Sequence, residues 1–174
     1  MRIAIIFDSV TGNTRLIAEA IRQGCEGEEI VCFGTPQNEI KADCIFVGTW
    51  INNGRCSEKI SQYLKSLTDE KIAFFGTAGT AKEQDYRKFE NDMKALAGDS
   101  NRYLGCFFCQ GKLRKEHKGL FEKLLAQNPD DENLKTIVLN FDSTLTHPDD
   151  LDRKNAMEFA RSVMKQITED FCAK

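Results

Sequence analysis

Along the chain, short apolar runs alternate with longer segments in which apolar residues recur at helical spacing. The short runs are rich in β-branched residues and lie at 3–7, 29–33, 44–48, 72–76 and 103–109. Short apolar runs of this kind are typical of strands that are buried on both faces of a sheet. The alternation therefore predicts an α/β fold in which helices cover both faces of a parallel sheet.

Three segments between the runs place their apolar residues on one helical face, as crossover helices do. The stripes are Leu16, Ile17, Ala20 and Ile21 in residues 14–24; Ile60, Leu64 and Leu67 in 57–67; and Phe89, Met93 and Leu96 in 81–97. We therefore expect a helix in each of these segments.

The pattern changes after the fifth run, where residues 112–147 read as a helical insertion. One helix is expected at about 115–127 and a second after Asn128 and Pro129, a suitable cap and first-turn pair. The second helix carries apolar residues at helical spacing, namely Leu134, Ile137, Val138, Phe141 and Leu145. The alternation of Ile137, Leu139 and Phe141 leaves a strand open as the alternative.

A last helix is expected after Pro148. Its first turn is acidic, with Asp149, Asp150 and Asp152, which suits the positive end of the helix dipole. Its apolar face is formed by Ala156, Phe159, Ala160, Val163, Met164 and Ile167. The acidic run serves this terminus, with docking of a basic redox partner as the alternative.

Composition narrows the class of protein. The 174 residues fit one domain, 1–174, and 24 Lys and Arg against 27 Asp and Glu give a net charge of −3. This balance argues against nucleic acid and an anionic membrane as partners. The apolar start is too short for a signal peptide, no stretch is long enough to span a bilayer, and the seven cysteines are expected to be reduced. We therefore expect a cytoplasmic protein.

The connection between the first run and the first helix has the character of an anion cradle. Its sequence is Ser9, Val10, Thr11, Gly12, Asn13 and Thr14. Hydroxyls, a glycine and the free N–H groups of a helix end can hold a phosphate without Lys or Arg, although plain helix capping explains the same residues. The loop lacks the lysine of a Walker motif and the spaced glycines of a dinucleotide fingerprint.

This loop resembles the phosphate-binding loop of the flavodoxin family, at the expected place after strand one. The resemblance implies a five-stranded parallel sheet of order 2-1-3-4-5 in a three-layer sandwich. It also implies FMN as the cofactor, held at the carboxyl ends of the strands.

Two further segments resemble the flavin-flanking loops of that family. After strand three come Thr49, Trp50, Ile51, Asn52, Asn53 and Gly54, and after strand four come Thr77, Ala78 and Gly79, followed by Thr80. The resemblance implies that Trp50, the only tryptophan, stacks on the flavin ring. No tyrosine stands in the second of these loops, so one face of the ring is open or covered by a partner. The helical insertion and the segment 109–112 resemble a divergent flavodoxin-like branch of anaerobic bacteria.

The remaining chemistry-bearing residues suggest packing more than catalysis. Cys106 and Cys109 point to opposite faces if they lie on a strand, so they are expected in the core. Cys56 lies at a helix start, where a thiolate is favoured, and is the one cysteine that could be reactive. His117 and His147 are expected to be surface or capping residues. We predict no catalytic residue and no metal site.

Three functions follow from this interpretation. The first is an FMN-binding electron carrier that accepts electrons from a reductase and delivers them to an acceptor enzyme. The second is an FMN-dependent NAD(P)H reductase of a small molecule such as a quinone, with the insertion as a lid or wall. The third is an accessory subunit with the flavodoxin fold. The oligomeric state stays open.

Overall fold

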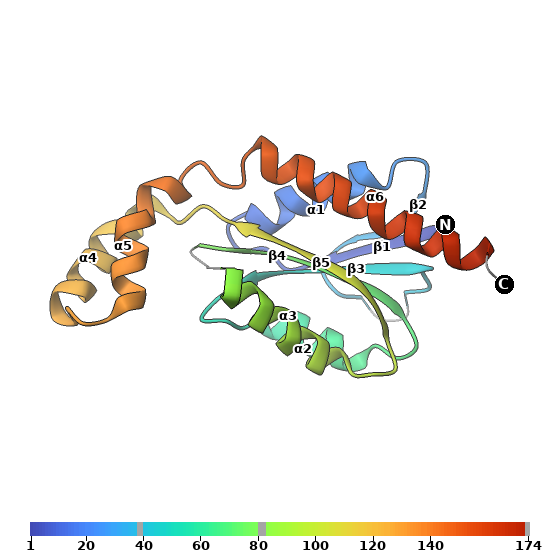
Figure 1. Cartoon of the computed structure of the whole chain (residues 1–174), viewed down its shortest axis with the longest axis horizontal. Helices are drawn as coiled ribbons and strands as arrows, with labels where there is room; N and C mark the ends of the chain where they lie inside the picture. The colour runs from blue at the N-terminus through green and yellow to red at the C-terminus, as the bar shows by residue number, and fades with distance from the viewer. Residues whose placement is uncertain (38–39, 80–82, 173–174) are drawn as a thin grey trace.

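The computed structural model describes residues 1–37, 40–79 and 83–172 (Figure 1). The five strands in this part of the chain form one parallel sheet of order β2-β1-β3-β4-β5, which confirms the predicted order. The strands are β1 (Arg2–Phe7), β2 (Glu29–Gly34), β3 (Cys44–Ile51), β4 (Lys71–Ala78) and β5 (Arg102–Gln110).

Helices cover both faces of the sheet. On one face lie α1 (Asn13–Gly24) and α6 (Asp150–Cys172), and on the other lie α2 (Glu58–Ser66) and α3 (Glu83–Ala97) (Figure 1). Alternate residues of β1 serve the two layers, because successive side chains of a strand point to opposite faces. Ile5 packs with the α1 and α6 side chains, and Ile6 with those of α2 and α3. The buried face predicted for α6 is confirmed.

The elements differ from their predicted bounds mainly at the carboxyl ends of β3 and β4. Both strands continue past Gly48 and Gly76, where the predicted runs end. Each glycine instead permits close packing: a Cβ on Gly48 would enter the ring of Phe75, and one on Gly76 would lie 2.8 Å from the Thr49 carbonyl oxygen. The helix predicted over 81–97 is described from Glu83, and residues 81–82 lie outside the described part of the chain.

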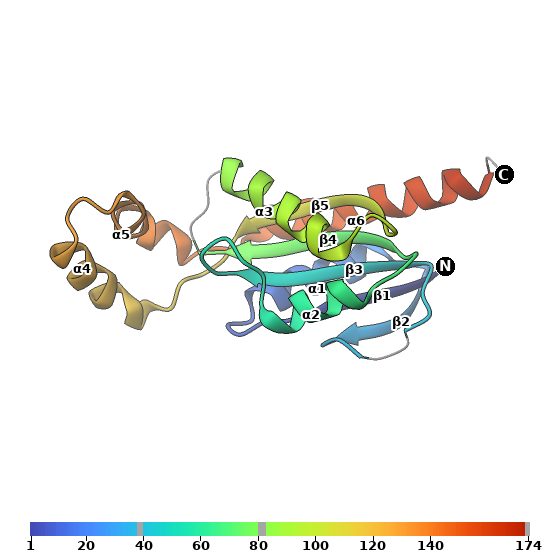
Figure 2. The same cartoon turned by 90° about the horizontal axis from the view of Figure 1, so that it is seen from below.

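The insertion forms a helical arm, which consists of η1 (Lys115–His117), α4 (Lys118–Gln127) and α5 (Glu132–Thr144). Figures 1 and 2 both show α4 and α5 beyond the carboxyl end of the sheet, away from the helices that cover it. Phe141 is 1% exposed and lies 6.2 Å from the ring of Phe121, so the arm has a small core of its own.

The structure of the arm corrects one prediction about α5 and rules out one alternative. Residues 137–141 are helical, so the alternative strand is wrong. The helix is capped by Asp131, whose carboxylate accepts from the N–H groups of Asn133 and Leu134, and not by Asn128 as predicted. Asp131 has the better position because its side chain reaches two N–H groups of the first turn that have no helical acceptor.

Candidate functional site

The candidate site is built at the carboxyl ends of β1, β3 and β4. Parallel strands end at the same edge of a sheet, and the register pairs Phe7 with Gly48 and Trp50 with Thr77. The three predicted loop segments therefore meet in space although they are far apart in sequence.

The first segment has the geometry of an open anion cradle. β1 ends at Phe7 and α1 begins at Asn13, with Gly12 as its N-cap at a left-handed φ of 90°. No side chain caps the helix at this residue, and a Cβ on Gly12 would have no atom within 4 Å. Thr11 is exposed, and Val10 is 60% exposed although it is apolar. The N-terminus of α1 is thus left accessible to a ligand.

The last residue of this loop has a different environment. Thr14 is 1% exposed, and its hydroxyl shares a hydrogen bond of 3.0 Å with the hydroxyl of Thr77, which is 3% exposed. The structure brings these two predicted site residues together, but their hydroxyls bind each other and so connect the first segment to the third. Asn13 and Ser9 also bind within the protein, since the Asn13 amide donates to the Lys112 carbonyl and the Ser9 hydroxyl accepts from the Arg15 N–H.

Trp50 is held by the end of β1. Its indole N–H donates to a carboxylate oxygen of Asp8 at 3.1 Å, and both residues are half-buried. Asp8 was not among the predicted site residues, because a carboxylate after a strand carries no signal of a partner on another strand. This contact fixes the edge of the indole and leaves Trp50 partly accessible beside the first loop.

The residues around Trp50 fall into two groups. Asn52 and Arg55 exchange two backbone hydrogen bonds of 3.0 Å, and Asn53 and Gly54 turn the chain at left-handed φ values of 49° and 70°. These turn residues are exposed, whereas Ile51 is half-buried. Thr49 is fully buried, and its hydroxyl accepts from the N–H of Ser57 at the start of α2.

The third segment is covered by the chain that follows β5. Ala78 is buried, and its carbonyl accepts from the Gly111 N–H at 2.7 Å. Gly79 accepts from the Gln110 amide at 3.1 Å, and a Cβ on Gly79 would collide with Leu113. Thr80 lies outside the described residues.

Residues 110–113 are the part of the site that the sequence interpretation missed. The signal was present in Gly111, whose added Cβ would lie 2.9 Å from the Asn13 amide nitrogen and 3.1 Å from Thr77. A glycine directly after a strand end marks such a close approach as well as an ordinary turn.

Residues 4–161 match the flavodoxin domain family. The chain belongs to the flavodoxin family. Two curated relatives are each named flavodoxin-like domain-containing protein BilS. The relative from Clostridioides difficile (strain CD3) is 29% identical, over 94% of this chain and 97% of its own. The relative from Clostridium symbiosum (strain WAL-14163) is 33% identical, over 87% and 90%.

Solved structures show the same fold at low sequence identity. A WrbA-like flavodoxin from Agrobacterium tumefaciens has a TM-score of 0.56 at 14% identity, covering 94% of this chain and 98% of its own. Oxidised flavodoxin 2 from Bacillus cereus has a TM-score of 0.55 at 16% identity, covering 95% and 99%. Rubredoxin oxygen:oxidoreductase from Desulfovibrio gigas has a TM-score of 0.58 at 12% identity, covering 98% of this chain and 37% of its own.

Family membership supports FMN as the cofactor of this flavodoxin, and the residues present fit that group. The N-terminus of α1, where Ser9 takes up only the Arg15 N–H, offers its other first N–H groups and a positive dipole end to a phosphate. Trp50 offers a half-buried aromatic face, and the buried Ser57 hydroxyl finds no hydrogen-bond partner among the described residues. The exposed candidates for contact with FMN are Val10, Thr11, Asn52, Asn53 and Gly54, and the half-buried ones are Ser9, Gly12, Asn13, Trp50, Ile51 and Gly79.

Three cysteines that the sequence singled out, Cys56, Cys106 and Cys109, behave as packing residues. Cys109 packs with the α1 and α6 layer and Cys106 with the α2 and α3 layer, as predicted for opposite faces of a strand. Burial raises the pKa of the Cys106 thiol to about 11 and also raises the pKa of the Cys109 thiol. Burial likewise raises the pKa of Cys56, which favours its packing role over a reactive thiolate.

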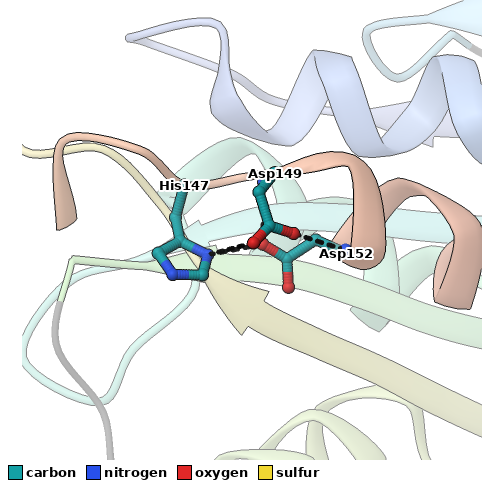
Figure 3. Close-up of side chains that lie close together, drawn as sticks. All are labelled: His147, Asp149 and Asp152. Carbon is teal, nitrogen blue, oxygen red and sulfur yellow. Dashed lines mark hydrogen bonds and ion pairs between the residues drawn. The ribbon is translucent and has the colours of Figure 1, made fainter. Parts of the chain in front are cut away.

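His147, Asp149 and Asp152 lie close together at the start of α6 (Figure 3). The N–H of Asp149 donates to Asp152, the N–H of Asp152 donates to Asp149, and His147 Nδ1 lies 2.6 Å from an Asp152 oxygen. The backbone hydrogen bond from Asp152 lowers the pKa of Asp149. The sequence predicted His147 as a surface or capping residue, and in the structure it is half-buried beside the residues that cap α6. The reciprocal bonds form a capping box, which confirms the predicted role of the acidic residues.

In the described part of the chain, no helix combines the length and the apolar character that a bilayer crossing requires.

Proposed function

We propose that this flavodoxin is an FMN-binding electron-transfer protein that accepts electrons from a reductase and passes them to an acceptor enzyme. When bound, FMN supplies the redox chemistry, while the protein supplies binding and orientation. Thr11 and the N-terminus of α1 would hold the phosphate, and Trp50 would lie against the flavin ring.

The observation that carries this proposal is the scarcity of acid–base groups in the three segments that form the candidate flavin site. In residues 8–14, 49–54 and 77–79, Asp8 is the only titratable side chain, and it accepts a hydrogen bond from Trp50. A carrier needs an exposed flavin edge and no group that moves a substrate proton. A substrate-reducing enzyme commonly needs such a group.

An FMN-dependent NAD(P)H reductase of a small molecule such as a quinone is the second candidate. The observation that favours it is the attachment of the arm to the site. Leu113 packs on Gly79, and its N–H lies 3.4 Å from the hydroxyl of Thr144 at the end of α5. An arm anchored there could form one wall of a substrate pocket.

Anaerobic reduction of the purified protein distinguishes the candidates. FMN is added if the protein is colourless, and the visible spectrum is followed during separate titrations with dithionite and with NADPH. We expect bleaching by dithionite and none by NADPH unless a reductase is added. Rapid bleaching by NADPH alone would support the reductase instead.

Failure to bind FMN would contradict both candidates and would support a third role, an accessory subunit with a flavodoxin fold.

A further inference from the structure

The root of the helical arm carries a cluster of cations in a chain whose net charge is −3. Lys112, Arg114 and Lys115 are exposed, and none of the three side chains forms an ion pair or hydrogen bond with a described residue. Glu116, also exposed, is the one carboxylate in residues 112–118, and Lys118 is bound to Asp142 at 2.8 Å. We call Lys112, Arg114 and Lys115 the basic root.

The basic root lies directly beside the candidate cofactor loops. The carbonyl of Lys112 accepts from Asn13 of the first loop at 2.9 Å. Leu113, between the first two cations, packs on Gly79 of the third. These contacts fix the backbone of the basic root at the carboxyl edge of the sheet, where an electron must leave the protein.

The arm beyond the basic root presents apolar side chains to solvent. Leu120 of α4 is 53% exposed and Leu139 of α5 is 82% exposed. Figures 1 and 2 show both helices extending outward from the carboxyl edge, so the arm adds area next to the basic root. Protein interfaces in general have an apolar centre and a polar rim, and these leucines and the basic root can supply both.

We propose that the basic root and the arm form the docking surface for a redox protein whose own surface is acidic around its cofactor. The inference rests on the proposed electron-transfer function and adds the chemistry of the partner. In the acidic run before and at the start of α6, the carboxylates of Asp149 and Asp152 are bound in the capping box, and the exposed carboxylate of Asp150 is paired with Arg153 at 3.3 Å.

The net charge of the chain and the local charge of the basic root have opposite effects on the approach of an acidic partner. At low ionic strength an acidic protein is repelled by a chain of net charge −3 but attracted by an exposed cation cluster at the point of contact. Such steering raises association rates about tenfold or more and weakens as salt screens it. The sign of the salt dependence therefore reports which charge the partner meets.

Rubredoxin, a small acidic iron protein, is the probe, and mitochondrial cytochrome c is the basic counterpart. The FMN-loaded chain is reduced with dithionite, the excess is removed, and each acceptor is mixed in by stopped flow. One electron leaves the reduced flavin for each ferric iron that becomes ferrous. We expect the rate with rubredoxin to fall as salt is raised, and the Arg114→Gln/Lys115→Gln variant to lose about tenfold at low salt.

The matched control is Lys41→Gln/Arg161→Gln. It removes the same charge from two exposed residues, one before β3 and one in the middle of α6. An equal loss in this control would overturn the proposal, because net charge would then account for the effect. An unchanged rate in Arg114→Gln/Lys115→Gln would also overturn it, because the partner would then not meet these cations. With cytochrome c, Arg114→Gln/Lys115→Gln is expected to react at least as fast as the parent.

Two further measurements distinguish a failure of the docking surface from a failure of the proposed electron-transfer function. FMN affinity is expected to be unchanged in Arg114→Gln/Lys115→Gln, and a tenfold loss would assign these cations to the cofactor phosphate instead. Binding of the FMN-free chain to rubredoxin is measured by calorimetry. Salt-sensitive binding that the variant weakens would support the docking surface even if the chain failed as a carrier, and binding that the variant leaves unchanged would refute it.

Discussion

Two threonines of the same loop have different environments. Thr11 is exposed beside the N-terminus of α1, while the hydroxyl of Thr14 is buried against that of Thr77. We predict that Thr11→Val weakens FMN binding about tenfold or more, since a hydrogen bond to a charged group contributes about 1.5–3 kcal/mol. Thr14→Val should instead lower the free energy of unfolding by about 1–3 kcal/mol, because the Thr77 hydroxyl loses its partner. Fluorescence titration and urea denaturation measure the two effects.

The double variant Thr14→Val/Thr77→Val is the control for this assignment. Replacing both hydroxyls by apolar groups of similar shape removes the unsatisfied partner, so its stability should exceed that of Thr14→Val alone. Equal losses of FMN affinity in Thr11→Val and Thr14→Val, at unchanged stability, would show that both hydroxyls contact the phosphate.

The contact between Trp50 and Asp8 predicts a graded effect. Asp8→Asn keeps an oxygen acceptor for the indole N–H, whereas Asp8→Ala removes it. Because a hydrogen bond contributes about 0.5–1.5 kcal/mol, Asp8→Ala should weaken FMN binding about two- to tenfold and shift the emission of Trp50 to longer wavelength. Trp50 is the sole tryptophan, so its fluorescence needs no correction. Identical emission in Asp8→Ala and the parent would contradict this positioning role.

At the residue scale, the sequence placed the candidate segments at one edge of the sheet but did not show how their residues pair. The order of loops after strands is local information, and it placed residues 9–14 and 49–54 correctly at one edge. The Thr14–Thr77 and Asp8–Trp50 contacts join residues 63 and 42 positions apart. A single sequence carries no record of such pairs, so the buried state of Thr14, Thr49 and Thr77 emerged only in three dimensions.

Among the elements, α5 shows how a buried aromatic residue decides between helix and strand. A strand over 137–141 would have placed Leu139 on the same face as Phe141. In the helix Phe141 is 1% exposed and Leu139 is 82% exposed, because α4 is the one described helix beside it and covers a single stripe. The sequence favoured the helix by its spacing, but it could not give the cap at Asp131, since Asn128 and Asp131 are both good cap residues.

Phe141 predicts that the arm unfolds independently of the sheet. Phe141→Ala should remove about 3–5 kcal/mol of packing, which exceeds what a small hairpin can lose while staying folded. Hydrogen exchange should therefore accelerate across residues 115–144 and remain unchanged in β1, β3 and β4. Leu139→Ala, on the exposed side of the same helix, is the matched control and should change neither. Faster exchange throughout the sheet would show instead that the arm stabilises the whole chain.

Over the whole molecule, the alternation of runs and helical segments predicted a parallel sheet covered by helices on both faces, and the resemblance to flavodoxins implied the strand order that the structure confirms. The direction of the arm was not predictable in the same way. The helices of the arm carry apolar residues at the same spacing as helices that pack on a sheet, although some of these residues, such as Leu120, are exposed. Only the structure shows that these helices extend away from it (Figure 2).

The last prediction concerns the layer that holds the phosphate loop in place. α1 packs against α6 at Gly24, where a Cβ would lie 2.5 Å from the Met157 carbonyl oxygen and 2.7 Å from the Cβ of Ala160. Gly24→Ala must therefore separate the two helices, and we expect a loss of about 1–3 kcal/mol in the free energy of unfolding. Gly119→Ala in α4, with no atom within 4 Å of the added Cβ, should be neutral or stabilising. Because α1 carries the phosphate loop at its other end, the displaced helix in Gly24→Ala should also bind FMN more weakly. Thermal denaturation with and without FMN measures both effects, and an unchanged Tm would show that α1 and α6 can separate without cost.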